Sequence, residues 1–82
     1  MYFQELKRDV FIDELNTCIK WADEYGNKYV SKDYFIYGIL GHKRYEFAKS
    51  REMLNTLVEE NVVIIGTNNE GKECLSLNLS DK

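Results

Sequence analysis

Apolar side chains recur between residues 9 and 26 at the spacing of one helical face. The spacings alternate between four and three residues, and the positions that share this face are Phe11, Leu15, Cys18, Ala22 and Tyr25. Asp9 lies just before them and is a suitable N-cap, because its carboxylate can accept a backbone N–H of the first turn. Gly26 follows and can adopt the left-handed conformation that ends many helices. The pattern predicts an amphipathic helix from Asp9 to Gly26.

Two further helices are predicted between residues 29 and 61. Tyr29 and Val30 form a short β-prone pair, and Ser31 is a suitable N-cap for a second helix that ends at Gly41. A turn over residues 42–45 leads into a third helix, which ends at residues 59–61. The apolar face of this third helix is predicted to consist of Phe47, Ser50, Leu54, Leu57 and Val58.

Residues 62–79 have the pattern of a β-hairpin. A β-branched run over residues 62–66 is followed by a polar loop at 67–72, and then by a segment in which leucine alternates with smaller or polar side chains. The buried face is predicted to carry Leu75, Leu77 and Leu79 opposite Val63 and Ile65. Cys74 is expected on the polar face. The whole pattern predicts an α+β fold of three helices followed by a C-terminal hairpin.

The composition fits one small domain. The chain has 82 residues, of which 44% are hydrophobic, enough for a single core but too few for two. We expect a core over residues 9–79 and leave residues 1–8 and 80–82 open as flexible ends. There is no apolar run of about 20 residues and no leader pattern, which predicts a cytoplasmic protein with no membrane contact. Two cysteines and one histidine have no metal-binding spacing, so neither a metal nor a cofactor is predicted.

The charges are distributed unevenly along the chain, so the net charge alone is a poor guide to the partner. The net charge of −3 disfavours a nucleic-acid partner at first sight. However, residues 42–51 contain four basic residues and one acidic residue, a charge of +3, while the rest of the chain carries −6. One basic patch therefore lies on an acidic chain, and it coincides with the turn and the beginning of the third helix. A solvated basic turn without function is the alternative interpretation of this patch.

The segment from Ala48 to Val63 resembles the recognition helix and first wing strand of the winged helix-turn-helix family. A Leu-x-x-Leu pair and two acids precede an Ile/Val strand, and the expected order of elements over residues 9–79 also fits. The chain is similar in this respect to the gamma domain of bacterial DNA translocases and to small plasmid or phage regulatory and replication proteins. One departure is Asn61-Val62, where many members have Gly-Ile or Gly-Leu; asparagine also tolerates the left-handed conformation.

The resemblance implies binding of double-stranded DNA through the third helix, in transcription regulation or replication. In a helix-turn-helix, the beginning of the second helix of the motif enters the major groove and nearby cations contact phosphates. The residues that occupy these places are Lys43, Arg44, Lys49, Ser50, Arg51, Asn55 and Thr56, with Lys72 in the wing loop. Ser50 belongs equally to the apolar face of that helix. The sequence contains no nucleophile with a partner base and no phosphate-binding glycine loop, so an enzyme is not predicted.

Two alternatives remain open on the sequence. The first is a winged helix used as a protein-interaction or inhibitor module, phage- or plasmid-encoded, in which the acidic part of the chain binds a basic partner. The second is a resemblance of residues 22–40 to half of a Clp-protease N-terminal repeat, which is all-helical and does not predict the hairpin. Trp21 lies off the main stripe of the first helix and is expected either at the edge of the core or in a contact with a partner, including a homodimer.

Overall fold

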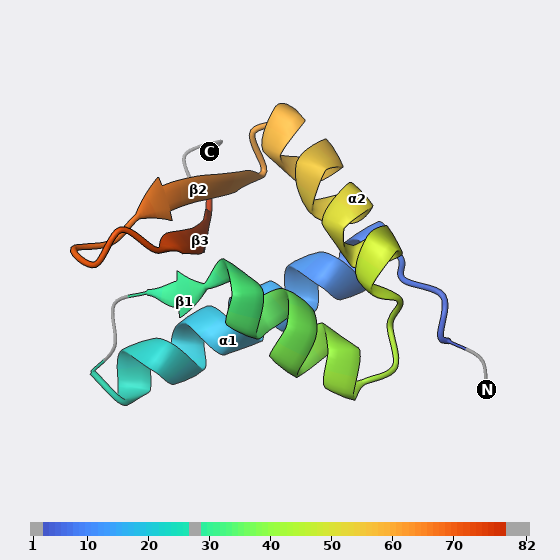
Figure 1. The fold of residues 1–82 in the computed structure, drawn as a ribbon, viewed down its shortest axis with the longest axis horizontal. Helices are drawn as coiled ribbons and strands as arrows, with labels where there is room; N and C mark the ends of the chain where they lie inside the picture. Colours follow the sequence, from blue (N-terminus) through green and yellow to red (C-terminus); the bar gives the residue numbers. More distant parts are fainter. Residues whose placement is uncertain (1–2, 27–28, 79–82) are drawn as a thin grey trace.

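The computed structural model describes residues 3–26 and 29–78, and these form an α+β domain (Figure 1). In this part of the chain three helices accompany a three-stranded antiparallel sheet. The elements in chain order are α1 (Arg8–Glu24), β1 (Val30–Ser31), η1 (Tyr34–Leu40), α2 (Phe47–Glu59), β2 (Val63–Thr67) and β3 (Glu73–Leu77). The presence of the sheet shows that the all-helical alternative is wrong. The predicted order of helices and strands is confirmed.

Helix α1 follows its predicted apolar stripe for most of its length. It begins at Arg8, one residue before the predicted N-cap, and Asp9 lies in its first turn, where a carboxylate interacts favourably with the helix dipole. Phe11, Leu15 and Cys18 are buried along it. Tyr25 was expected on this stripe but is exposed, because it lies after the last helical residue. Gly26 has φ +81°, the left-handed conformation predicted for it.

Helix η1 differs from the prediction in type and in the conformation at its end. The Ser31 hydroxyl accepts the backbone N–H of Tyr34 at 3.3 Å, as expected of an N-cap. The helix over Tyr34–Leu40 is a π-helix, whose hydrogen bonds span five residues instead of four. The π-helix ends at Leu40 with Gly41 as its C-cap, as predicted, but Gly41 keeps right-handed helical angles and the backbone stays helical through His42. The left-handed residue comes later, at Arg44, with φ +69°. Gly41 is also a place of close approach: a β-carbon there would lie 2.7 Å from Cε1 of Phe47.

Helix α2 buries the face that the sequence predicts, except at its first residue. Ser50, Leu54 and Leu57 are buried, whereas Phe47 is half exposed and meets the Tyr37 ring edge to face, with 4.8 Å between ring centroids. Phe47 was predicted to face the core. It lies over Gly41 and Tyr37 because η1 and α2 approach closely there. Asn61 ends the helix region with φ +63°, the left-handed conformation that asparagine tolerates.

The sheet has the order β1-β3-β2, so the last strand is central. The hairpin register sets Val63 opposite Leu77 and Ile65 opposite Leu75, as the alternation predicts. In the loop, the Asn68 side-chain oxygen accepts the backbone N–H groups of Glu70 and Lys72 at 2.9 and 3.0 Å. Leu79, predicted on the same face as Leu75, lies outside the described residues.

Cys74 corrects the prediction for the polar face of the hairpin. It was expected to be exposed, but it is buried. Its strand is central, so Cys74 has Ser31 of β1 on one side and Gly66 of β2 on the other. A small side chain between two neighbouring strands is shielded from water even on the face away from the core.

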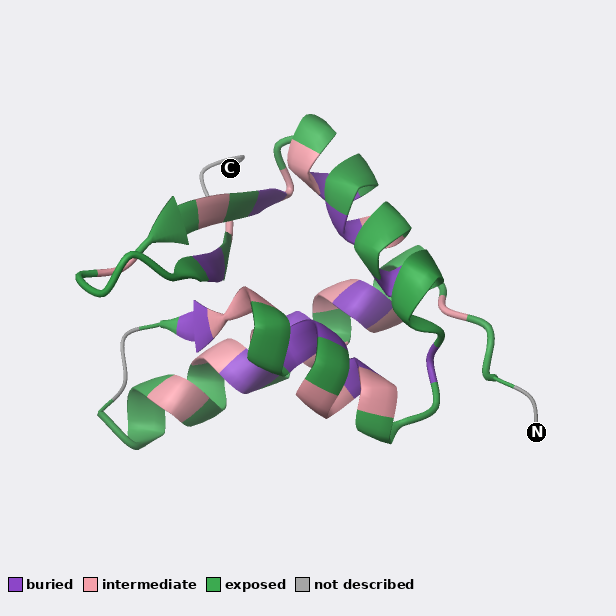
Figure 2. Ribbon diagram, viewed as in Figure 1, coloured by how far each residue is buried: buried purple, intermediate pink, exposed green. Residues whose placement is uncertain are grey.

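The core lies where α1, η1 and α2 meet the inner face of the sheet (Figure 2). Phe11 and Phe35 form its centre; both are fully buried, with their ring centroids 5.2 Å apart in an edge-to-face contact. Arg8 at the beginning of α1 forms an ion pair with Glu60 just after α2. The three helices therefore meet in the core, and the beginning of α1 and the end of α2 are also joined at its margin.

The segment before α1 is extended and lies along the turn after η1. The Gln4 backbone N–H donates to the Arg44 carbonyl at 2.8 Å, and the Gln4 side-chain amide donates to the Lys43 carbonyl at 2.6 Å. Leu6 packs against the core. Residues 3–7 are thus held by the domain rather than being a free end, while residues 1–2 and 80–82 of the predicted flexible ends lie outside the described part.

Replacing Leu75 by alanine should destabilise the domain by about 2–5 kcal/mol, because Leu75 is only 3% exposed on the central strand. Leu77→Ala should cost less, because Leu77 is only partly buried. Urea unfolding followed by circular dichroism measures both, and Ser76→Ala, at an exposed site on the same strand, is the control. A loss at Leu75 no larger than that at Ser76 would contradict the packing described here.

Candidate nucleic-acid interface

The basic patch predicted over residues 42–51 is divided among several surfaces of the folded chain. Lys43 and Arg44 lie in the turn after η1, next to the extended N-terminal segment. Lys49 and Arg51 lie on α2, where two residues correspond to a rotation of about 200° around the helix. The charges that are neighbours in the sequence therefore do not form one continuous surface.

Lys43 has an acidic partner within the chain. Its ammonium donates a hydrogen bond to the Glu14 carboxylate at 2.7 Å, which joins the turn to α1. This hydrogen bond holds the pKa of Lys43 above its ordinary value. A phosphate would have to compete with Glu14 for this cation, so Lys43 is a weaker candidate for DNA contact than the sequence suggests.

Lys49 and Thr56 lie together on another side of α2. They line a hollow of about 570 Å³ between this helix and the extended segment around Gln4. Three carboxylate residues line the same hollow: Glu5, Glu46 and Glu52. The Thr56 hydroxyl donates to the backbone carbonyl of Glu52 at 3.1 Å. Acids outnumber cations here, which disfavours a nucleic-acid backbone.

Ser50 is the one predicted DNA contact that the structure contradicts. Its side chain is 0% exposed, and its hydroxyl donates to the backbone carbonyl of Glu46 at 2.9 Å. This residue therefore fills a position on the core face of α2 with its polar atom satisfied inside the chain. The helical period favoured this outcome, since Ser50 shares a face with Leu54 and Leu57.

Arg51 and Asn55 lie together on the side of α2 that faces η1. They line a hollow of about 280 Å³ with Lys32, Asp33 and Tyr37. The Arg51 guanidinium donates to the Tyr37 hydroxyl at 2.9 Å, which leaves most of its five N–H donors for other partners. Two of the predicted DNA contacts, Arg51 and Asn55, thus lie at the same hollow.

Lys72 of the hairpin loop lies at a neighbouring hollow. This hollow has a volume of about 390 Å³ and is lined by Lys72 and Glu73. Lys32 and Asp33 also line it, and they line the hollow beside Arg51 as well. Lys32 donates to the Glu73 carboxylate at 2.6 Å, and this hydrogen bond raises the pKa of Lys32. A phosphate would have to compete with Glu73 for Lys32, as it would with Glu14 for Lys43. We call the set Lys32, Arg51, Asn55 and Lys72 the Lys32 surface.

Lys32 is the residue that the sequence reasoning missed. It follows Ser31, the correctly predicted N-cap, so it stands at the beginning of the helix before α2. In helix-turn-helix proteins the helix before the recognition helix crosses the DNA backbone. A cation next to a predicted N-cap is therefore a usable signal for a phosphate contact, although Lys32 lies outside the basic cluster at residues 42–51.

The cysteines and acids of the described residues bear on two further kinds of site, a reactive thiol and a metal site. Burial, together with the nearby Glu14 carboxylate, raises the pKa of the Cys18 thiol, which disfavours the reactive thiolate form. Within residues 3–26 and 29–78, no three histidine, cysteine or acidic side chains are placed to hold a metal ion. None of the helices described there is both long enough and apolar enough to cross a bilayer.

Comparisons of the chain with protein-family models, with curated proteins and with solved structures found no match. The geometry of the Lys32 surface and the order of the elements that carry it are therefore the observations that bear on function.

The ion pair between Lys43 and Glu14 should make stability depend on pH in alkaline solution. Because folding raises the pKa of Lys43, its contribution is complete below the unfolded value of 10.5 and is lost as pH rises through the folded value. The wild-type chain should therefore lose more stability between about pH 9 and about pH 11 than Lys43→Met does. Urea unfolding at both pH values measures the difference.

Glu14→Gln is the control for this prediction, since it removes the partner but keeps the lysine. It should reduce the alkaline loss as Lys43→Met does, and the double variant should add nothing further. Equal alkaline losses in the wild type and all variants would contradict a stabilising ion pair between these two residues.

Proposed function

We propose that this chain is a winged-helix protein that binds double-stranded DNA, in transcription regulation or replication. Three helices, a short strand after the first of them and a C-terminal hairpin support this fold, because the winged helix-turn-helix has the same order. In this arrangement α2 is the recognition helix, η1 is the helix before it, and the loop between β2 and β3 is the wing.

The observation that carries the proposal is the meeting of three cations from three elements. Lys32 lies two residues before η1, Arg51 on α2 and Lys72 in the wing loop. The two hollows that they line share Lys32 and Asp33. In the proposed complex these cations contact phosphates and fix the position of α2 on the duplex. Asn55, next to Arg51, is the side chain suited to reach a base edge, since an amide pairs with adenine.

The acidic residues of the same region limit the affinity. Asp33 and Glu73 line the hollows with the three cations, and Glu52 and Glu59 lie on the exposed side of α2. The two hollows carry three cations against two acids, a charge of +1, and this becomes −1 when Glu52 and Glu59 of α2 are counted. The chain as a whole is negative. We therefore expect non-specific binding to be weak. The rest of the affinity should come from contacts or DNA deformation that favour a particular sequence or shape.

Affinity for random duplex DNA should fall with salt according to three phosphate contacts. If Arg51 and Lys72 each neutralise one phosphate and Lys32 exchanges Glu73 for a third, the log-log slope is about −2.7, or a loss of about 40-fold between 50 and 200 mM salt. Fluorescence anisotropy with a labelled duplex measures this slope. Arg51→Ala should weaken binding to all sequences and reduce the slope by about one unit.

Lys49→Ala is the matched control, because it removes the same charge from the same helix but from the hollow beside Gln4. Its slope should stay close to the wild-type value. An equal effect of both variants would mean that only net charge matters, and absence of binding at about 50 mM salt would overturn the proposal.

Asn55→Ala should affect only DNA that contains a preferred sequence. A bidentate amide contact to adenine discriminates by about 1–3 kcal/mol, so the variant should bind a selected site about 5- to 150-fold more weakly and random duplex unchanged. Selection from a random duplex library, followed by titration of both DNAs, measures this. A uniform loss on both DNAs would instead assign Asn55 to the phosphate backbone.

A protein-interaction module is the second candidate, and the acidic exposed side of α2 favours it. Glu52 and Glu59 occupy that side, where a recognition helix in the major groove would face the negative DNA. In this alternative the same helix binds a basic protein surface. Two results together would support this alternative. The DNA titration would show no binding, and a defined basic protein would bind the wild-type chain but not the Glu52→Lys variant.

A further inference from the structure

An aromatic pair, Tyr37 and Phe47, lies outside the core and directly beside the Lys32 surface. Tyr37 is 45% exposed and Phe47 47%, and neither belongs to the core cluster. The two rings meet edge to face where η1 and α2 approach each other. Tyr37 lines the same hollow as Arg51 and Asn55, whereas Phe47 does not. The pair therefore extends from the close contact of the two helices to the Lys32 surface.

Helix α2 presents a row of three side chains toward Tyr37. Phe47, Arg51 and Asn55 are each four residues apart, a spacing that places successive side chains one turn apart on the same side of a helix. The Tyr37 ring meets Phe47 with 4.8 Å between centroids, and the Tyr37 hydroxyl accepts an N–H of Arg51 at 2.9 Å. Asn55 lines the same hollow. Tyr37 thus contacts two members of the row, one through its ring and one through its hydroxyl.

The position of the Phe47 ring depends in turn on Gly41. A β-carbon at position 41 would lie 2.7 Å from Cε1 and 3.4 Å from Cζ of Phe47, so the ring occupies the space that any other side chain would need. Phe47 packs on the backbone there, and Tyr37 packs on Phe47. An aromatic side chain has only two rotatable bonds, so packing orders it at low entropic cost. The Tyr37 hydroxyl is consequently an acceptor in a fixed place.

We propose that Tyr37 is a positioning residue, which holds the Arg51 guanidinium in the orientation that contacts a DNA phosphate. This role rests on the proposed function of the Lys32 surface and adds to it a residue without charge. An arginine side chain gives up rotational freedom when it binds, and an arginine already held by one N–H has given up part of it before DNA arrives. The N–H groups that do not bond to Tyr37 remain for two parallel hydrogen bonds to a phosphate.

Tyr37→Phe removes only the hydroxyl and keeps the ring against Phe47. It should weaken binding of random duplex DNA about two- to tenfold, because Arg51 must then be ordered by the DNA itself. The salt slope should stay close to the wild-type value, since Arg51 keeps its charge and still neutralises a phosphate. Fluorescence anisotropy at several salt concentrations measures both quantities. Circular dichroism checks that the variant is folded.

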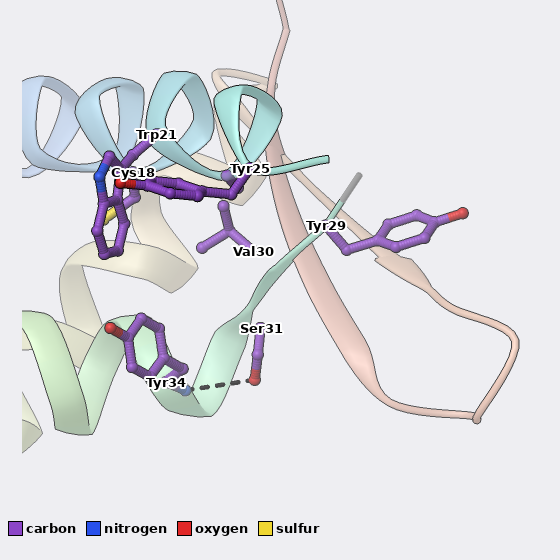
Figure 3. Close-up of a pocket in the computed structure, with 8 residues that line it drawn as sticks. Cys18, Trp21, Tyr25, Tyr29, Val30, Ser31 and Tyr34 are labelled. Atoms are coloured by element: carbon purple, nitrogen blue, oxygen red, sulfur yellow. Dashed lines mark hydrogen bonds between the residues drawn. The ribbon is translucent and has the colours of Figure 1, made fainter. Parts of the chain in front are cut away.

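Tyr34→Phe is the matched control, because it removes a hydroxyl from a second tyrosine of the same helix. Tyr34 is 53% exposed and lines a separate pocket between α1, β1 and η1, together with Trp21 and Val30 (Figure 3). None of the four residues of the Lys32 surface lines that pocket. Tyr34→Phe should bind DNA like the wild type. An equal loss of affinity in the two variants would overturn the positioning role.

A double-variant cycle separates positioning from a direct contact of Tyr37 with DNA. If the hydroxyl acts through Arg51, Tyr37→Phe should have no further effect in a chain that already carries Arg51→Ala. Additive losses would assign the hydroxyl to a DNA contact of its own and would overturn the proposal.

The order of Arg51 in the free protein is a readout that does not depend on DNA. Nitrogen-15 relaxation of the Arg51 Nε–H group should show an ordered side chain in the wild type and in Tyr34→Phe, and a mobile one in Tyr37→Phe. A mobile Arg51 in the wild type, or equal order in all three proteins, would overturn the positioning role and leave DNA binding in place. Absence of DNA binding by the wild-type chain would overturn the proposed function, and the positioning role with it.

Discussion

The edge-to-face contact between Phe11 and Phe35 determines how the other elements are placed. It holds α1 against η1 in the centre of the core, and both rings are fully buried. Strand β1 connects these two helices, so its pairing with β3 depends on the same contact. The Lys32 surface follows from it, because the beginning of η1 is held beside the hairpin, where Lys32 reaches Glu73. The polar surface is thus positioned by an apolar contact that contains none of its residues.

Elements with a strict period could be predicted from the sequence. The alternation of leucine after residue 72 fixed the hairpin register, because a slip of one residue would turn the apolar side chains to the solvent. The stripe of α1 fixed which of its faces is buried. Ser31 and Gly26 were predicted correctly because the N-cap and the left-handed end are local requirements that depend on few neighbours.

The candidate site was harder to predict, because it depends on direction around a helix and on contacts between distant residues. Lys49 and Arg51 are two residues apart, but a helix turns them toward different hollows. The partner of Lys43 is Glu14, far away in the sequence, and no local pattern indicates it. The reason for a glycine at position 41 is similarly distant, since the Phe47 ring of the next helix leaves no room for a side chain there. Cys74 is buried because its strand is central, which only the sheet order reveals.

The π-helical form of η1 has a consequence for changes in the length of the chain. Each of its hydrogen bonds closes around one residue more than in an α-helix, so the segment Tyr34–Leu40 holds its residues in fewer turns. Deleting one residue there would let the remaining backbone continue as an ordinary α-helix between the same two ends. We therefore expect this segment to tolerate a one-residue deletion that neighbouring α2 would not, since in α2 the same deletion would rotate every later side chain by about 100°.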